Sequence, residues 1–238
     1  MPYPALATLG AMFAGLGLAP AADEDVSKSQ TAQDDRLQHV PGNLPILDVG
    51  CGINKYPGSI GIDRNRNTRA DVIADLDQFP FPFRDGAFRE LRAIHVIEHV
   101  SDVIRTMEEF HRLLAPGGRA VIVTPHYTDF SSFCDPTHRW HLNSFSLRFF
   151  GDDHGGYAYY SHARFREIST RIRLLAFWRY LGFELLVNHF RWFRRFWEFY
   201  LCYLIRGKVI EWQLEAVQAA TAGQHSAGPS NPPSSSGS

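Results

Sequence analysis

Residues 46–52 read Ile-Leu-Asp-Val-Gly-Cys-Gly, and residues 60–63 read Ile-Gly-Ile-Asp. A short apolar run ends in each segment, the first at a pair of glycines and the second at a carboxylate. Parallel α/β sheets build nucleotide pockets in this way, because glycine lets the backbone approach a ligand and an acid on the next strand can accept both ribose hydroxyls. The third glycine of a dinucleotide fingerprint would stand at position 55, which is lysine, and this argues against an NAD-dependent enzyme.

Three further motifs follow in a fixed order along the chain. They are Asp-Leu at 75–76, Val-Ile-Glu-His at 96–99 and Leu-Leu-Ala-Pro-Gly-Gly at 113–118. With the first two segments they form, over roughly residues 44–125, a series that resembles the motifs of class I S-adenosylmethionine-dependent methyltransferases. Only residues 54–59 separate the glycine turn from the second strand, and this abbreviated form is similar to a type 11-like bacterial subgroup often associated with surface-polysaccharide genes.

The resemblance implies a cofactor and a role for each motif. The cofactor would be S-adenosylmethionine, with its amino-acid end on the glycine turn, its ribose on Asp63 and its adenine beside Asp75. The alternative for Asp75 is a turn residue, because aspartate favours turns. The family also places residues at the end of the fourth strand, here His95, close to the methyl group. The predicted cofactor-binding residues are Asp48, Gly50, Cys51, Gly52, Asp63, Asp75, Leu76 and His95.

Alternating strand and helix patterns predict an α/β fold, a Rossmann-like, mostly parallel seven-stranded sheet with helices on both faces. A helix with Ser101 as its N-cap is predicted up to Leu114, because apolar residues recur there at helical spacing. The irregular segment 126–140 is predicted to cover the acceptor side. The predicted strands are 46–49, 60–62, 72–74, 91–96, 119–124, 157–173 and 181–187, with a connecting element at 177–180, a helix at 192–205 and a strand or helix at 209–217.

Composition indicates one globular domain with an extension at each end. The chain has 238 residues, 45% of them hydrophobic, and a formal net charge of −1, so no global field favours nucleic acid. Three cysteines without a CxxC pair favour a reducing, cytoplasmic compartment. The apolar segment 5–19 follows no basic residue, which disfavours a signal peptide. We expect a disordered or processed extension at 1–40, a methyltransferase domain at 41–220 and a disordered tail at 221–238.

Two histidines are candidates for the catalytic base. Methyl transfer from a sulfonium is an in-line displacement, so alignment suffices unless the acceptor must lose a proton. His95 is the predicted base because imidazole titrates near neutral pH, and the alternative is a hydrogen-bonded structural histidine. His138, oriented by Asp135, is the second candidate, and an Asp-Pro turn on a surface loop is its alternative. A histidine base suits a hydroxyl, so we expect methylation of a small-molecule or glycan acceptor at oxygen.

The pattern His-x-x-Glu-His at 95–99 also raises the question of a metal. Some methyltransferases that act on RNA ends or on quinone precursors carry Glu-x-x-Glu-His at this place and bind a divalent ion with it. The corresponding set here would be His95, Glu98 and His99, with His126, His138 or His141 as a further ligand. Many relatives have the Glu-His pair without a metal, and an imidazole replaces the first carboxylate. The sequence therefore favours a site with no metal.

The segment 164–197 carries eight arginines against Glu167 and Glu184, with aromatic rings between them. Such a segment could hold an anionic glycan, a lipid-linked phosphate or RNA, or rest on an anionic membrane surface and make the protein peripheral to the membrane. The favoured alternative is a solvated face with the rings in the core. Nucleic acid is the disfavoured partner, and the oligomeric state stays open. Two other functions remain, a non-catalytic binding module and a metal-dependent RNA methyltransferase.

Overall fold

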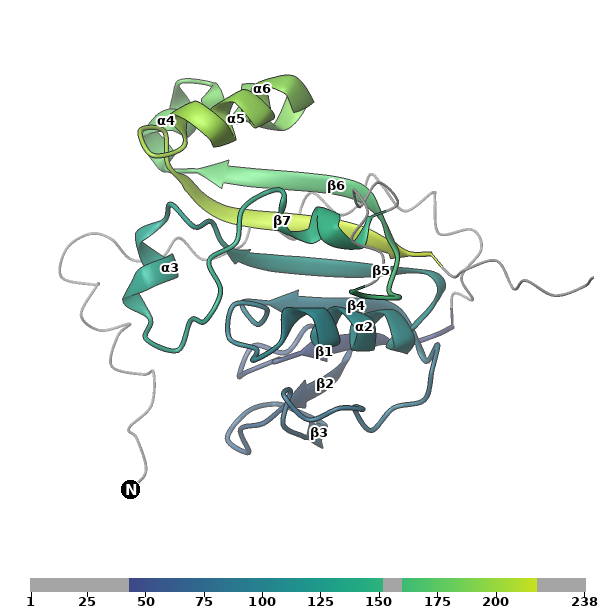
Figure 1. The fold of residues 1–238 in the computed structure, drawn as a ribbon. Helices are drawn as coiled ribbons and strands as arrows, with labels where there is room; N and C mark the ends of the chain where they lie inside the picture. Colours follow the sequence, from purple (N-terminus) through teal and green to yellow (C-terminus); the bar gives the residue numbers. More distant parts are fainter. Residues whose placement is uncertain (1–42, 152–159, 218–238) are drawn as a thin grey trace, which may run out of the picture. The chain divides into compact units, whose positions relative to one another are not determined.

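The computed structural model describes residues 43–151 and 160–217, which belong to one compact unit. Its centre is a seven-stranded sheet in the order β3-β2-β1-β4-β5-β7-β6 (Figure 1). Strands β1 to β5 pair in parallel, and β7 runs antiparallel to both of its neighbours. The strands are β1 (Ile46–Val49), β2 (Ile60–Asp63), β3 (Val72–Ile73), β4 (Phe88–Ile94), β5 (Leu114–Pro125), β6 (Phe165–Leu174) and β7 (Gly207–Ala216).

This sheet confirms the predicted Rossmann-like, mostly parallel seven-stranded α/β fold. The central strands are apolar at successive positions because both faces of the sheet are covered, and Leu47, Val49, Leu91 and Ile122 are almost completely buried. The first three strands lie where the sequence predicts them. The predicted extensions at 1–40 and 221–238 lie outside the described residues, and the domain boundaries stay predictions.

Helix α2 (Val103–Leu113) connects β4 to β5 and packs with Met107 and Phe110 against the core. Its N-cap is Asp102, whose carboxylate accepts a hydrogen bond from the backbone N–H of Arg105 at 3.0 Å. The prediction of Ser101 as N-cap is therefore wrong. The backbone N–H of Ser101 instead donates to Asp77 at 2.8 Å, which ties the start of the helix to the loop after β3.

Strands β4 and β5 both differ from the predicted bounds. β5 begins at Leu114, directly after α2, because the Pro-Gly-Gly segment continues as extended chain rather than as a loop. A bulge between Phe88 and Glu90 absorbs the extra residues, since Phe88 pairs with Leu114 and Glu90 with Arg119. β4 ends at Ile94, so the next residue, His95, stands just beyond the sheet.

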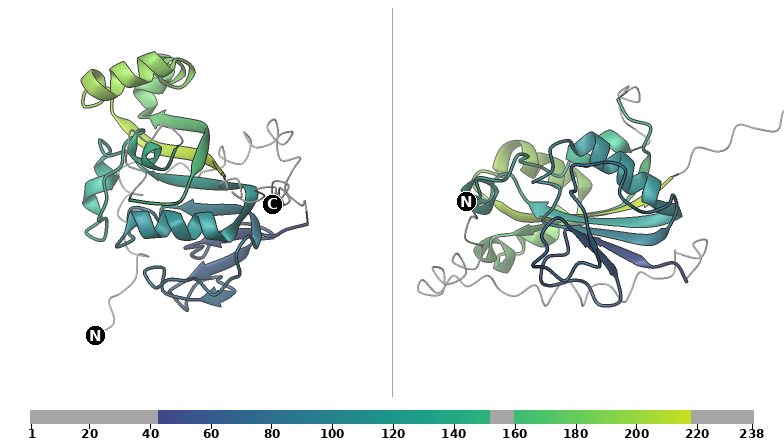
Figure 2. Two further views of the ribbon diagram at one scale, coloured as in Figure 1. Left: turned by 45° about the vertical axis from the view of Figure 1, so that its right-hand side comes forward. Right: turned by 90° about the horizontal axis from the view of Figure 1, so that it is seen from below.

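In the part that the structure describes, the chain beyond β5 contains six short helices and the two antiparallel strands β6 and β7. The prediction of a strand at 181–187 is wrong, because these residues enter α5, whose side chains of Glu184 and Asn188 hydrogen-bond to the backbone of β6. Helices α4 to α6 lie together beside this edge strand (Figure 2). The elements are α3 (Phe130–Cys134), the 3-10 helix η5 (Ser146–Phe150), α4 (Ala176–Tyr180), α5 (Phe183–His189), α6 (Arg191–Phe196) and the π-helix η7 (Trp197–Leu201).

The other elements predicted beyond β5 correspond to elements of the structure. The helix predicted at 192–205 corresponds to α6 and η7, and the alternatives at 209–217 resolve to strand β7. The strand predicted at 157–173 corresponds to β6, and its first residues, 157–159, lie outside the described part of the chain. Among the helices described, none has the length and apolar character needed to cross a membrane.

Candidate active site

The glycine turn after β1 has the backbone that the sequence predicts. Gly50 and Gly52 have φ angles of +62° and +54°, in the left-handed region that favours glycine. A Cβ at Gly50 would lie 2.5 Å from Val96 Cγ2, so the chain after β4 approaches this turn closely. A Cβ at Gly52 would meet no atom within 4 Å, so the space beside Gly52 is open. The turn therefore has room for a ligand on one side and close packing on the other.

Asp63 ends β2 beside this turn. Its Oδ2 accepts the backbone N–H of Gly52 at 3.0 Å, and its Oδ1 accepts that of Asn65 at 2.8 Å. A carboxylate oxygen has more than one lone pair, so these bonds leave acceptor capacity for further hydroxyls. The structure thus brings together the glycine pair and the acid that the sequence singles out.

Two other predicted residues contact protein rather than open space. Asp48 is buried and accepts the backbone N–H of Tyr56 at 2.8 Å, and burial raises the pKa of its carboxyl. Cys51 is also buried, packs against Gly61, and has a thiol pKa raised by burial to about 11. Both side chains hold the shape of the loop between β1 and β2.

Asp75 and Leu76 follow β3 and adjoin the same turn. The Asp75 carboxylate accepts the backbone N–H of Asp77 at 3.1 Å, the bond expected of a turn residue. Leu76 Cδ1 would lie 3.7 Å from a Cβ at Gly50, which brings this leucine beside the glycine turn. The contacts of Asp75 are therefore those of a turn residue, whereas Leu76 lines the glycine turn after β1.

His95 occupies the end of β4 in a strained conformation. Its φ is +56°, the one positive value among the non-glycine residues described. Such outliers cost about 1–3 kcal/mol and cluster at functional sites. Its Nδ1 lies 3.1 Å from Glu98 Oε1, and the imidazole is 44% exposed. The buried glutamate therefore holds a histidine whose other nitrogen is open to a ligand.

The second predicted pair, Asp135 and His138, is looser than expected. The distance from His138 Nε2 to Asp135 Oδ2 is 3.8 Å, longer than a hydrogen bond. Asp135 forms the predicted Asp-Pro turn by accepting from the N–H and hydroxyl of Thr137. Burial opposes ionisation of Asp135, but these two hydrogen bonds outweigh it and lower the pKa of the carboxyl. His138 Nδ1 instead lies 3.0 Å from the carbonyl oxygen of Ser132.

The sequence favours no metal, and the set that it offers for one, His95, Glu98 and His99, is not the group whose ligand atoms lie together in the structure. Glu98, His99 and His138 offer ligand atoms that all lie within 4.8 Å of one another. The rings of His99 and His138 meet edge to face at 4.6 Å, and burial lowers the pKa of His99. The other two candidate ligands lie elsewhere, because His126 is buried against Glu198 and His141 contacts Ser132.

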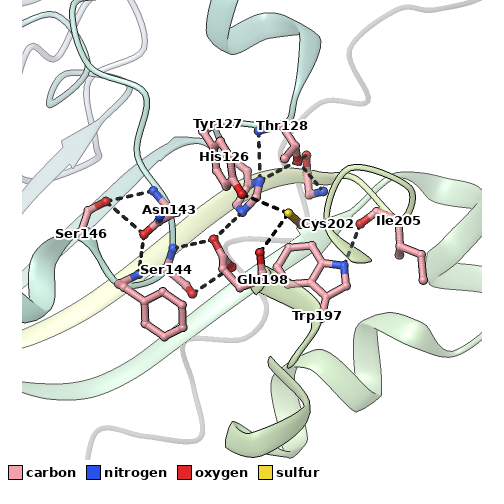
Figure 3. A network of polar contacts seen from close by, with 12 residues as sticks. His126, Tyr127, Thr128, Asn143, Ser144, Ser146, Trp197, Glu198, Cys202 and Ile205 are labelled. Atoms are coloured by element: carbon pink, nitrogen blue, oxygen red, sulfur yellow. Dashed lines mark hydrogen bonds and ion pairs between the residues drawn. The ribbon is translucent and has the colours of Figure 1, made fainter. Parts of the chain in front are cut away.

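A buried polar network that sequence patterns do not reveal joins β5 to η7 (Figure 3). Glu198 accepts from His126 Nε2 at 3.1 Å and, through its other oxygen, from the Ser144 hydroxyl at 3.0 Å. The second nitrogen of His126 contacts the Thr128 hydroxyl at 2.7 Å. Since these residues are 72 and 54 positions from Glu198, no local pattern could have found the network. It fixes both ends of the segment that carries His138.

Comparison with known proteins decides the family. A family model described as a methyltransferase domain matches residues 30–197. The chain belongs to this methyltransferase family. It is a class I, S-adenosylmethionine-dependent methyltransferase, and the predicted cofactor is confirmed.

Curated relatives resemble only part of the methyltransferase. The tRNA (carboxymethyluridine(34)-5-O)-methyltransferase alkbh8 of Xenopus tropicalis is 36% identical over an alignment of 104 residues, and the match covers 37% of this chain and 16% of that protein. A probable tRNA methyltransferase 9B of Homo sapiens is 37% identical over an alignment of 100 residues, which covers 34% of this chain and 21% of that protein. The chloroplastic tocopherol O-methyltransferase of Arabidopsis thaliana is 30% identical over an alignment of 121 residues, which covers 41% of this chain and 35% of that protein.

Among solved structures, an S-adenosylmethionine-dependent methyltransferase from Archaeoglobus fulgidus is similar at a TM-score of 0.49 and 16% identity, covering 74% of this chain and 87% of that one. The first curated relatives are several times longer than the segment they share with this chain. Their names therefore bear on the acceptor only as suggestions.

Proposed function

We propose that this methyltransferase transfers a methyl group from S-adenosylmethionine to a hydroxyl oxygen of a small-molecule or glycan acceptor. The observation that carries the proposal is the position of His95. It follows β4 directly, its neighbour Val96 packs against Gly50, and Glu98 contacts its Nδ1. A base beside the glycine turn would face the reacting end of the cofactor.

The residues around the turn fit the cofactor. In this proposal the open space beside Gly52 takes the amino-acid end, the free acceptor capacity of Asp63 takes the ribose hydroxyls, and Leu76 packs against the adenine. Asp48 and Cys51 support the loop from inside the protein. When bound, S-adenosylmethionine supplies an electrophilic methyl group on sulfur.

The proposed chemistry of the chain is proton removal at His95. In this proposal Glu98 Oε1 accepts a hydrogen bond from the Nδ1–H of His95, which fixes the tautomer and leaves Nε2 as the basic atom. Nε2 then takes the proton of the acceptor hydroxyl as its oxygen attacks. General bases of this kind typically contribute about 10²–10⁴-fold in rate.

The test separates cofactor binding from catalysis. Calorimetry with S-adenosylhomocysteine should show binding to the purified protein, and absence of binding would favour the non-catalytic module. His95→Gln should lower the turnover number by about 10²-fold or more with the affinity for S-adenosylhomocysteine retained. An unchanged turnover number would contradict the role of His95 as base. Acceptors would be screened as free saccharides with radiolabelled S-adenosylmethionine.

RNA is the second candidate acceptor, and the names of two relatives favour it. The same labelling assay would include unmodified transfer RNA beside the saccharides. Incorporation into RNA that is lost on His95→Gln would assign the activity to RNA and contradict the glycan proposal. Activity retained in excess chelator would remove the metal-dependent version of this alternative.

A further inference from the structure

Three side chains from two distant segments converge behind His95. Glu98 and His99 follow β4, and His138 follows α3, yet one ligand atom of each lies within 4.8 Å of the other two. Backbone hydrogen bonds hold the segments together, since the carbonyl oxygen of Glu98 accepts from Arg139 at 2.8 Å and from Trp140 at 3.2 Å. The cluster is thus built into the fold.

In each of the three side chains, one possible metal-ligand atom makes no hydrogen bond to any described residue. Glu98 is 1% exposed, and its Oε2 is buried without a hydrogen-bond partner while Oε1 contacts His95. His99 Nδ1 contacts the Thr137 hydroxyl and His138 Nδ1 the Ser132 carbonyl. The Nε2 atom of each ring then makes no hydrogen bond within the part of the chain that the structure describes, although that of His138 lies 3.8 Å from Asp135 Oδ2. Burying a carboxylate oxygen without a hydrogen-bond partner costs free energy. A cation bound by this oxygen and the two imidazoles would offset that cost.

We propose that Glu98, His99 and His138 bind a divalent transition-metal ion. Two imidazoles and one carboxylate form the ligand set of catalytic zinc sites, which leave a position open for water or substrate. Hydrogen bonds to the far nitrogens of both rings are the usual outer support of metal-binding histidines. The nitrogen ligands select against Mg²⁺ and Ca²⁺, which prefer all-oxygen sites.

The metal site adds to the proposed function. A catalytic role of the ion rests on that proposed function, whereas binding of the ion does not. Oε1 of Glu98 contacts the proposed base, His95, so one carboxylate would contact both the base and the ion. A cation there would attract an acceptor hydroxyl toward the open coordination position beside His95. Of the ligands that the sequence suggests, this set keeps Glu98, His99 and the further candidate His138, and leaves out His95.

The experiment uses the full chain without a histidine tag, freed of metal with a chelator and titrated with Zn²⁺ or with Mg²⁺ in a calorimeter. We expect one Zn²⁺ per chain and no comparable heat from Mg²⁺. Glu98→Gln and His138→Ala should each weaken Zn²⁺ binding by about tenfold or more. The matched control is His189→Ala, which removes an exposed histidine of α5 and should leave the affinity unchanged.

Two results would overturn the metal site. One is the absence of Zn²⁺ binding to the wild-type protein, and the other is equal affinity in the wild type and both variants. Thermal unfolding followed by circular dichroism would show whether either variant is folded. Binding of S-adenosylhomocysteine by a wild-type protein that binds no Zn²⁺ would reject the metal and leave the proposed function standing.

A different observation, the exposed apolar surface of residues 177–204, carries a second proposal. The prediction that the rings of segment 164–197 lie in the core is wrong for Phe177, Trp192 and Phe196. Trp197 is buried, and Trp178 and Phe193 pack against the core. Large apolar side chains exposed in such number over one short stretch of chain usually mark an interaction site. The members of this apolar surface, between 40% and 85% exposed, are Phe177, Tyr180, Leu181, Leu185, Leu186, Phe190, Trp192, Phe196, Phe199, Tyr200, Tyr203 and Leu204.

The exposed charges around the apolar surface are positive. Both acidic side chains of the segment are engaged inward, since Glu184 accepts the backbone N–H of Leu174 at 2.9 Å and Glu198 is buried against His126. Arginine beside exposed aromatic and aliphatic side chains is the composition of helices that lie in a membrane interface. The exposed basic residues are Arg171, Arg179, Arg191, Arg195, Arg206 and Lys208.

Hydrogen bonds on the inner side connect the helices of this surface to the rest of the protein. Asn188 bonds to both the N–H and the carbonyl of Ile172 in β6, and the indole N–H of Trp197 donates to Ile205 at 2.8 Å. The exposed apolar side chains therefore lie outside the core that these contacts complete. Base stacking by RNA could use the rings but not the four leucines, which have favourable partners in acyl chains.

We infer that the apolar surface docks in the plane of an anionic lipid bilayer. The purified protein should co-sediment with phosphatidylcholine vesicles that contain phosphatidylglycerol, and more weakly with phosphatidylcholine alone. Combining Leu185→Ser with Trp192→Ser should abolish sedimentation with both, and combining Arg191→Gln with Arg195→Gln should remove the preference for the anionic vesicles. The control is Ile73→Ser, an exposed apolar residue on β3 at the other edge of the sheet.

Failure of the wild-type protein to sediment with either vesicle would overturn this inference. So would equal sedimentation of the serine variants and the wild type, or binding of RNA that the serine variants lose while vesicle binding stays absent. Binding of S-adenosylhomocysteine, measured on the same variants, should be unaffected. That measurement separates loss of lipid contact from loss of the fold.

Discussion

Gly52 and Gly58 offer a matched pair of substitutions in the loop between β1 and β2. Both have a left-handed backbone, with φ of +54° and +74°, and a Cβ at either position would meet no atom within 4 Å. A left-handed L-residue costs about 1–2 kcal/mol, and a domain of this size loses about 2–4 °C in Tm for each kcal/mol. Gly52→Ala and Gly58→Ala should therefore each lower Tm by about 2–8 °C.

The two variants should differ in their affinity for S-adenosylhomocysteine. A Cβ at Gly52 points into open space, so an added methyl group would enter the space that we propose for the cofactor. Gly58 is exposed, outside that space, and carries only the backbone strain. We expect Gly52→Ala to weaken binding by about tenfold or more, which corresponds to about 1.4 kcal/mol, and Gly58→Ala to leave it unchanged.

Calorimetry with S-adenosylhomocysteine and thermal unfolding on the same samples would measure both effects. Gly50→Ala provides an upper reference, because its Cβ would lie 2.5 Å from Val96 Cγ2 and adds a clash to the strain. Equal affinities of Gly52→Ala and the wild type would refute the placement of the cofactor. Equal losses in Gly52→Ala and Gly58→Ala would show that strain alone, rather than occupied space, reduces binding.

Three further substitutions or modifications have defined outcomes. Asp63→Ala should weaken S-adenosylhomocysteine binding by about 1–3 kcal/mol in calorimetry, because a charged acceptor is lost; unchanged affinity would argue against its contact with the ribose. Hydrogen bonds from Lys55 and from Gly61 lower the pKa of Asp71 below its ordinary 3.8, so they stabilise the fold above that pH and the benefit disappears as the pH falls through the lowered value. Asp71→Asn should accordingly reduce the free energy of unfolding at pH 7 but not at strongly acidic pH in urea titrations. A thiol reagent at pH 8 should label one cysteine of the native protein, the exposed Cys134, since the other two are buried; labelling of all three without denaturant would contradict this.

The nucleotide-binding half of the fold could be predicted because its signals are local. A buried strand followed by glycines needs only a few neighbouring residues to be recognised, and the acid at the end of β2 is likewise read within its own strand. Even the departure at Lys55 has a local cause. Its ammonium pairs with Asp71 at 2.7 Å, which also accepts the N–H of Gly61, so the lysine joins two loops where a dinucleotide enzyme would need glycine.

The C-terminal half could not be predicted because its signals depend on partners far along the chain. Residues 181–187 form a short apolar run that suits a strand or a buried helix equally well. Contact with β6 selects the helix, because β6 is an edge strand whose free backbone N–H and carbonyl groups need hydrogen-bond partners. Glu184 and Asn188 supply these partners only when they are one helical turn apart, so tertiary contact determines the helix. His138 and Glu98 meet for a similar reason, 40 positions apart with no shared pattern.

Glu198 connects the surface of η7 with the candidate active site. One of its oxygens contacts His126 Nε2 and the other the Ser144 hydroxyl, so a single carboxylate holds both ends of the segment that carries His138 (Figure 3). Next to Glu198 along η7 stands Phe199, which belongs to the apolar surface. These buried hydrogen bonds join the segment to η7 directly. An acceptor that reaches the enzyme from the surface on which η7 rests would therefore meet His138 in a fixed position relative to that surface.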